Sequence, residues 1–179
     1  MNKIAEKNIY FLGIGGIGMS ALARYFYNKG CRVSGYDKTP SPLTRKLEEE
    51  GILVHYEDEP AMIPSDVDLV ILTPAIPADS KELAYLREKG VRIIKRAQVL
   101  GEISRQCDTV AVAGSHGKTT VTSLVSHILH YAQKPMSAFI GGIAKNINSN
   151  VIIGDENDEV VVMEADEFDR SFLQLTPYI

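Results

Sequence analysis

Residues 108–129, DTVAVAGSHGKTTVTSLVSHIL, constrain the fold of this chain more than any other stretch. The β-branched run 109–112 predicts a buried strand, and apolar residues at helical spacing follow Lys118. A loop of small residues joins the two. Glycines in such a loop let backbone N–H groups face phosphate oxygens, and the helix N-terminus adds a favourable dipole. The stretch therefore predicts an α/β sheet that carries a triphosphate-binding loop.

The match to the general phosphate-loop pattern is incomplete. The pattern G-x-x-x-x-G-K-[ST] requires a glycine at position 112, where this chain has Val112. The nearest upstream glycine is Gly114, so the loop is shorter than usual. The alternative interpretation is a tight strand-to-helix turn with a surface lysine. The strand before the loop and the helix after it favour the phosphate loop.

A second glycine motif lies near the N-terminus. Residues 8–12 read as a buried strand, and residues 13–18, GIGGIG, fit G-x-G-x-x-G. A helix over 19–29 and a strand over 32–36 follow, and Asp37 comes nineteen residues after the last glycine. This complete βαβ unit is typical of a nucleotide site. The alternative is that the glycines serve only close contact between helix and strand.

The rest of the first part alternates between strands and helices. Expected strands are 52–55, 68–72 and 91–94, and expected helices are 42–50 after the N-cap Ser41, 79–89 with Asp79 and Glu82 as caps, and 97–105. Residues 57–66 read as a loop. The alternation favours a Rossmann-like parallel sheet covered on both faces. Because ligands bind at the carboxyl ends of such strands, one ligand could contact residues 13–18, Asp37 and 73–76.

We expect a domain boundary near Gln106, with one domain over 1–106 and the beginning of a second over 107–179. In the second part, residues 137–143 are apolar, 145–150 read as a loop and 159–163 as a buried strand. Glu164 is the first polar residue after that strand, where an acid that binds Mg²⁺ belongs. For the acids that follow it, Asp166, Glu167 and Asp169, a solvated acidic turn is an equally good interpretation.

Composition excludes several classes of protein. A net charge of −4 gives no sign of a nucleic-acid surface, no apolar run could span a bilayer, and the N-terminus is not a signal peptide. Cys31 and Cys107 read as reduced cysteines of a cytoplasmic protein. We interpret His55 as structural, and His127 and His130 as residues of a helix surface, since no third ligand is spaced to join them.

A chain with a triphosphate loop and a separate nucleotide site is expected to activate or transfer a group carried on a nucleotide. Four segments, FLGIGGIGMSALARYF, TPAIP, VAVAGSHGKTTVTSLV and MEADEFDRSFL, resemble in this order the Mur ligases, which build the precursor of the bacterial cell wall. The resemblance covers essentially the whole chain. It implies a Rossmann-like domain that binds the UDP of a sugar substrate instead of NAD, followed by a phosphate-loop ATPase domain.

The resemblance also implies roles for individual residues. The UDP-contacting positions are Gly13, Ile14, Gly15, Gly16, Ile17, Gly18, Asp37, Thr73, Pro74, Ala75 and Ile76. The ATP loop is Gly114, Ser115, His116, Gly117, Lys118, Thr119 and Thr120. Lys118 and His116 are the catalytic candidates, and Thr119 and Glu164 would hold Mg²⁺. The implied reaction uses ATP to phosphorylate the carboxylate of UDP-N-acetylmuramate, and the amine of L-alanine then attacks the acyl-phosphate.

One departure from the family is large, because its members continue for several hundred residues. We therefore expect an N-terminal fragment that is inactive alone and that could self-associate through an open sheet edge. Three alternatives remain. They are a ligase that recycles murein tripeptide onto the same sugar nucleotide, an NAD-linked oxidoreductase, and a non-catalytic nucleotide-binding module.

Overall fold

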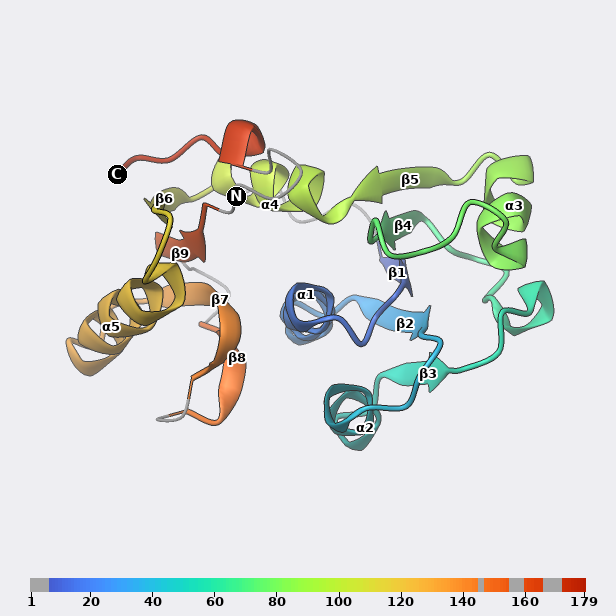
Figure 1. The fold of residues 1–179 in the computed structure, drawn as a ribbon, viewed down its shortest axis with the longest axis horizontal. Helices are drawn as coiled ribbons and strands as arrows, with labels where there is room; N and C mark the ends of the chain where they lie inside the picture. The colour runs from blue at the N-terminus through green and yellow to red at the C-terminus, as the bar shows by residue number, and fades with distance from the viewer. Residues whose placement is uncertain (1–6, 145–146, 155–159, 166–171) are drawn as a thin grey trace. The chain divides into compact units, whose positions relative to one another are not determined.

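A computed structural model describes residues 7–144, 147–154, 160–165 and 172–179 (Figure 1). The chain divides into two compact units, Met1–Arg96 and Ala97–Ile179. The division lies ten residues before the predicted boundary near Gln106, because most of helix α4 (Arg96–Ser104) belongs to the second unit.

The first unit is built on a five-stranded parallel sheet of order β3-β2-β1-β4-β5. Its strands are β1 (Asn8–Leu12), β2 (Arg32–Tyr36), β3 (Leu53–His55), β4 (Leu69–Leu72) and β5 (Arg92–Lys95). Its helices are α1 (Ile17–Asn28), α2 (Pro42–Glu49), α3 (Lys81–Glu88) and the short 3₁₀ helix η1 (Pro60–Met62). Figure 1 shows α1 and α2 on one face of the sheet and α3 on the other. The predicted Rossmann-like parallel sheet is confirmed.

Strand β1 lies at the centre of this sheet and is buried on both faces. Ile9, Tyr10, Phe11 and Leu12 are each no more than 1% exposed. A strand covered on both faces reads as a continuous apolar run, which is why these residues are recognisable in the sequence. Each buried apolar side chain of this size stabilises the fold by roughly 1.5–3 kcal/mol.

The start of α3 differs from the prediction. The N-cap is Ser80, whose Oγ accepts from the N–H of Leu83 at 3.3 Å, and Asp79 lies outside the helix. The capping carboxylate comes from the loop after β3, where Asp58 accepts from the backbone N–H of Lys81 at 3.0 Å and of Glu82 at 2.9 Å. Glu82 therefore does not act as a cap, and its side chain points into the interior of the unit. The same loop, predicted to be irregular over 57–66, contains η1.

The second unit has a four-stranded sheet of order β6-β9-β7-β8. Its elements after α4 are β6 (Asp108–Val112), α5 (Lys118–Tyr131), β7 (Met136–Ala144), β8 (Ser149–Ile152) and β9 (Val160–Glu164). Strands β6, β9 and β7 are parallel, and β8 runs antiparallel to β7. The prediction of a loop over 145–150 was therefore wrong for its last two residues. Ser149 and Asn150 are buried in β8, and the Ser149 hydroxyl bonds to the backbone of Val151.

The outer edge of β6 is occupied by the end of the chain itself. Ile179 donates its N–H to the carbonyl of Thr109 at 3.2 Å and accepts from the N–H of Ala111 at 2.9 Å. Tyr178 donates to the same Thr109 carbonyl at 2.8 Å. This is the hydrogen-bond pattern of a parallel pair. The edge expected to be open is thus partly covered, and self-association through it stays a prediction.

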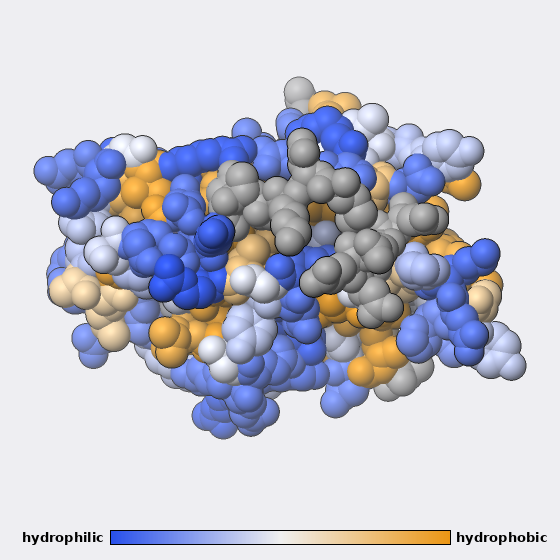
Figure 2. Space-filling view, turned by 180° about the vertical axis from the view of Figure 1, so that it is seen from behind, coloured by the Kyte–Doolittle hydropathy of each residue, from blue (hydrophilic) through white to orange (hydrophobic). Residues whose placement is uncertain are grey.

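Helix α5 presents apolar residues on two faces. Val125 and Leu129 contact the core of the second unit, while Leu124 and Ile128 are 56% and 64% exposed. In the space-filling view of Figure 2, hydrophobic residues appear as separate patches among hydrophilic ones. Within the described residues, no helix combines the length and the apolar character needed to cross a membrane.

Candidate functional site

The first candidate site begins where β1 turns into α1. Gly13 has a φ of +86°, a conformation that favours glycine, and its N–H donates to the carbonyl of Tyr36 at 2.8 Å. The N–H of Ile14 donates to the same carbonyl at 3.0 Å, which holds the turn against the end of β2. The N-cap of α1 is Gly16, which has no side chain to satisfy the first helical N–H groups. Such groups are ready donors for an anion.

Asp37, the residue after β2, lies directly against this loop. Its Oδ2 accepts from the N–H of Gly15 at 2.7 Å, and its Oδ1 accepts from Thr39 at 3.2 Å. A Cβ on Gly15 would lie 2.8 Å from Asp37 Oδ2 and 2.7 Å from Thr44 Cγ2. The loop therefore has no room for a side chain at position 15.

The turn after β4 completes this group of residues. Thr73 donates its N–H to the carbonyl of Leu12 at 3.3 Å, and Ile76 donates to Thr73 at 3.2 Å. A Cβ on Gly13 would collide with Thr73 Cγ2 and lie 3.6 Å from Ile76 Cδ1. The three segments singled out from the sequence, 13–18, Asp37 and 73–76, thus meet at the carboxyl ends of β1, β2 and β4.

The second candidate site is the loop between β6 and α5. Gly114 and Gly117 have φ of +146° and +77°, so both glycines are required by the backbone. Lys118, the first residue of α5, folds across the loop and donates from Nζ to the carbonyl of Gly114 at 2.7 Å. Ser115, His116, Thr119 and Thr120 are exposed at the loop and the start of the helix. A glycine-containing loop that leads into a helix N-terminus, with a lysine folded across it, is an arrangement that can bind phosphate oxygens.

Glu164 is brought to the second site by strand pairing. It lies opposite Val112, the last residue of β6, and its Oε1 accepts from the N–H of Gly141 at 2.8 Å. A Cβ on Gly141 would lie 2.8 Å from Glu164 Cδ, and a Cβ on Gly142 would lie 3.3 Å from Thr119 Cγ2. Thr119 and Glu164 therefore flank the same pair of glycines in β7. Sequence reasoning missed the role of this pair, although two consecutive glycines in an apolar strand were a usable signal.

A hydroxyl and a carboxylate beside a phosphate loop fit a hard cation such as Mg²⁺, which prefers oxygen ligands and is shared with substrate phosphates. Across the described residues, no three side chains of His, Cys, Asp or Glu gather closely enough to hold a metal by themselves. The acids Asp166, Glu167 and Asp169 lie outside the described residues.

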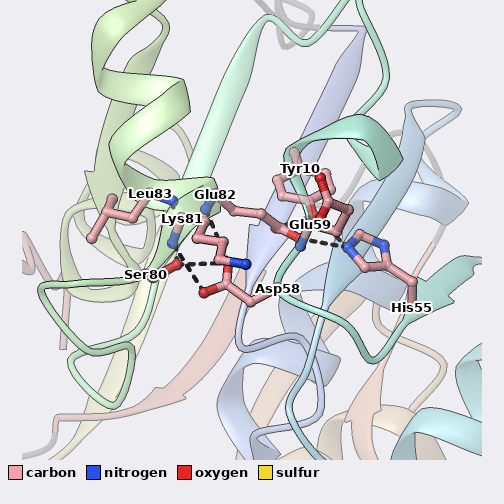
Figure 3. Close-up of polar contacts among 8 residues, drawn as sticks. All are labelled: Tyr10, His55, Asp58, Glu59, Ser80, Lys81, Glu82 and Leu83. Carbon is pink, nitrogen blue, oxygen red and sulfur yellow. Dashed lines mark hydrogen bonds and ion pairs between the residues drawn. The ribbon is translucent and has the colours of Figure 1, made fainter.

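A buried polar network, which sequence reasoning did not find, joins residues of β1, β3 and α3 (Figure 3). Glu82 is fully buried, and its Oε2 accepts from the Tyr10 hydroxyl at 2.5 Å. Its Oε1 lies 2.7 Å from His55 Nε2 and accepts from the N–H of Glu59 at 3.1 Å. Burial, reinforced by the hydrogen bond to Glu82, raises the pKa of Tyr10 above its ordinary value. His55, interpreted as structural, thus belongs to a network that joins β1, β3 and α3.

Asp58 ties the same loop to α3. Burial acts to raise the pKa of Asp58, but hydrogen bonds from the backbone of Glu82 and Lys81 and from the Ser80 hydroxyl outweigh it. The pKa of Asp58 therefore lies below its ordinary value. Burial also raises the pKa of Tyr36 and of Tyr56. The hydrogen bonds of Asp58 tie the loop after β3 to the start of α3, whose N-cap Ser80 lies four residues after the 73–76 turn.

Residues 8–107 match the Mur ligase family, catalytic domain. The chain belongs to the Mur ligase family. The UDP-N-acetylmuramate–L-alanine ligase of Cytophaga hutchinsonii is 52% identical over 186 residues, covering 100% of this chain and 40% of that protein. This Mur ligase chain therefore spans about two fifths of the length of the curated relatives it matches.

Solved structures agree with the fold of this Mur ligase chain. The UDP-N-acetylmuramate-alanine ligase of Thermotoga maritima matches with a TM-score of 0.84 and 33% identity over 95% of this chain and 39% of that one. A murein peptide ligase from Psychrobacter arcticus matches with a TM-score of 0.82 and 30% identity over 95% of this chain and 41% of that one.

Proposed function

We propose that this chain is the UDP-substrate-binding domain and the beginning of the ATPase domain of a cytoplasmic ligase that joins L-alanine to UDP-N-acetylmuramate. The observation that carries the proposal is the presence of two separate phosphate-type loops, each with its own acid. Asp37 contacts the first loop through Gly15, and Glu164 lies beside the start of the second opposite Val112. One nucleotide would be the carrier of the substrate and the other the source of energy for peptidoglycan precursor synthesis.

In the first site, the backbone N–H groups of the 13–18 loop would bind the diphosphate of the UDP-sugar. Asp37 and the 73–76 turn would contact the rest of the UDP group, because both lie at the same edge of the sheet as the loop. The two prolines that follow Thr73 and Ile76 restrict the turn, which would reduce the entropy lost on binding.

In the second site, residues 114–120 would hold the ATP phosphates. Lys118 would exchange its bond to the Gly114 carbonyl for one to a phosphate oxygen, and His116, exposed on the loop, could face either a phosphate or the sugar carboxylate. Thr119 and Glu164 would hold Mg²⁺, which neutralises phosphate charge. A carboxylate oxygen of the substrate would attack the γ-phosphorus with loss of ADP. The amine of L-alanine would then attack the acyl carbon with loss of phosphate.

The main alternative is a ligase that adds a murein peptide to the same sugar nucleotide. The TM-scores of the two solved relatives, 0.84 and 0.82, are nearly equal, so the fold of this part does not choose between them. The 52% identity to an L-alanine ligase favours L-alanine over a murein peptide as the group that is added. An NAD-linked oxidoreductase would leave the loop from Gly114 to Thr120 without a role, and a non-catalytic module would leave the placement of Glu164 unexplained.

Calorimetric titration of the 179-residue chain with UDP-N-acetylmuramate, NAD and ATP, each separately, tests the proposal. We expect the UDP-sugar to bind to the first site and NAD to bind more weakly or not at all. Tighter binding of NAD than of the UDP-sugar would contradict the proposal. In the full-length protein, phosphate release that depends on L-alanine identifies the alanine ligase, whereas release that depends on the murein tripeptide identifies the alternative.

A further inference from the structure

Arg96 lies at the same edge of the first sheet as the glycine loop. It follows Lys95, the last residue of β5, and it is half-buried. Strand β5 pairs with β4, and β4 pairs with β1, so Arg96 stands at the carboxyl ends of these parallel strands. No motif in the sequence distinguishes it.

The guanidinium of Arg96 reaches the first turn of α1. A Cβ built on Gly18 would collide with Arg96 Nη1 and would lie 3.1 Å from Cζ and 3.2 Å from Cδ. Helix α1 follows β1, whereas Arg96 follows β5, which lies on the far side of β4. The side chain therefore extends toward the point between β1 and β4 where the strand order reverses. Ligands of open parallel sheets bind in the crevice at this point.

The charges around the loop show what such an arginine could do. Asp37 places a negative charge against Gly15, on the side of β2. A diphosphate that binds to the loop would meet this carboxylate, and the dipole of α1 supplies only a partial positive charge. A guanidinium on the side of β4 and β5 would offset both negative groups. It also presents paired N–H donors that match phosphate oxygens.

We propose that Arg96 is a substrate-binding residue that contacts the diphosphate of the UDP-sugar, an inference that rests on the proposed function of the first site. This role of Arg96 also explains why the last residue of the 13–18 motif is a glycine. Gly18 leaves the space that the guanidinium of Arg96 occupies, so a side chain at position 18 would displace the arginine.

The test compares UDP with uridine, which lacks the phosphates, by NMR titration of the wild-type chain and three variants. Arg96→Gln should lower the affinity for UDP by about tenfold or more, because hydrogen bonds to charged groups are among the strong ones. Its affinity for uridine should not change. Arg96→Lys keeps the charge but not the paired donors, so its UDP affinity should lie between those of the wild-type chain and Arg96→Gln. Gly18→Ala should reproduce the selective loss with the arginine still present.

Arg92→Gln is the matched control, because Arg92 is exposed at the opposite end of the same strand. It removes the same charge and should leave UDP affinity unchanged. Unaltered UDP affinity in Arg96→Gln, or equal losses for UDP and uridine, would overturn the inference and leave the proposed function standing. A wild-type chain that binds neither UDP nor UDP-N-acetylmuramate would overturn both. Circular dichroism checks folding, and Arg96→Lys decides the question if Arg96→Gln does not fold.

Discussion

Val112 and Glu164 lie opposite each other on neighbouring parallel strands, and the N–H of Ala165 donates to the Val112 carbonyl at 2.9 Å. The phosphate loop leaves the sheet directly after Val112. The pairing of β6 with β9 therefore sets the acid beside the loop, although the two residues are far apart in the sequence. This relationship is the physical basis for the proposal that Glu164 takes part in the second site.

Glu164→Gln in the full-length enzyme should raise the magnesium concentration needed for half-maximal activity. The amide can still accept from Gly141 N–H, so the sheet should be preserved while the negative charge is lost. A magnesium titration of alanine-dependent phosphate release measures the effect. Asp108→Asn, at the exposed start of β6, is the control. An unchanged magnesium requirement would contradict the prediction and indicate that Glu164 has only a structural role.

Lys118→Ala in the full-length enzyme should lower turnover about a hundredfold or more, as expected when a charge-stabilising donor is removed. Binding of the UDP-sugar should remain nearly intact, since the Lys118 ammonium bonds to the Gly114 carbonyl of the second loop. Steady-state kinetics and calorimetry measure the two effects. Lys134→Ala, an exposed lysine after the other end of α5, should change neither. Parallel losses of turnover and UDP-sugar affinity would show that the two sites are not separate.

Gly15→Val should abolish UDP-sugar binding by the 179-residue chain. Its Cβ would lie within 2.8 Å of both Asp37 and Thr44, so the loop must shift from the geometry that the diphosphate needs. Gly30→Val is the control, because among the described residues a Cβ there meets no atom within 4 Å. That variant should lose stability through its positive φ and still bind. Calorimetry that finds normal affinity in Gly15→Val would contradict the assignment.

Asp58 should make the stability of the first unit depend on pH. Because its folded-state pKa lies below the ordinary value of 3.8, its charged form stabilises the fold above that pH. The contribution is lost as the pH falls through the folded-state value. Asp58→Asn should cost about 1 kcal/mol at neutral pH, as for loss of a helix cap, and less at pH ~3.

Urea unfolding at the two pH values measures this difference. Asp79→Asn is the matched control, because Asp79 is exposed and lies outside α3. Comparing the two variants tests whether Asp79 or Asp58 caps α3. A larger effect for Asp79→Asn than for Asp58→Asn would contradict the hydrogen bonds in the structure.

The sequence by itself determined the local elements and the chemistry of the two loops. Strands β1 and β2 have the predicted bounds. Strand β1 is a continuous apolar run, as expected for a parallel strand buried on both faces, and β2 lies between Gly30 and Asp37. Gly13, Gly114 and Gly117 could be recognised because the positive φ at each is a property of a few neighbouring residues.

Only the tertiary structure decided which distant residues meet. Asp79 had the local pattern of a cap, yet Asp58 took that role and Glu82 turned inward to Tyr10 and His55. The placement of Glu164 depends on strand order, and so does that of Arg96, because the end of β5 lies near the first turn of α1 only in the folded sheet. Periodicity and turn chemistry act over a few residues. Strand register and the need to satisfy every buried polar group act across the whole sheet, so they cannot be inferred one segment at a time.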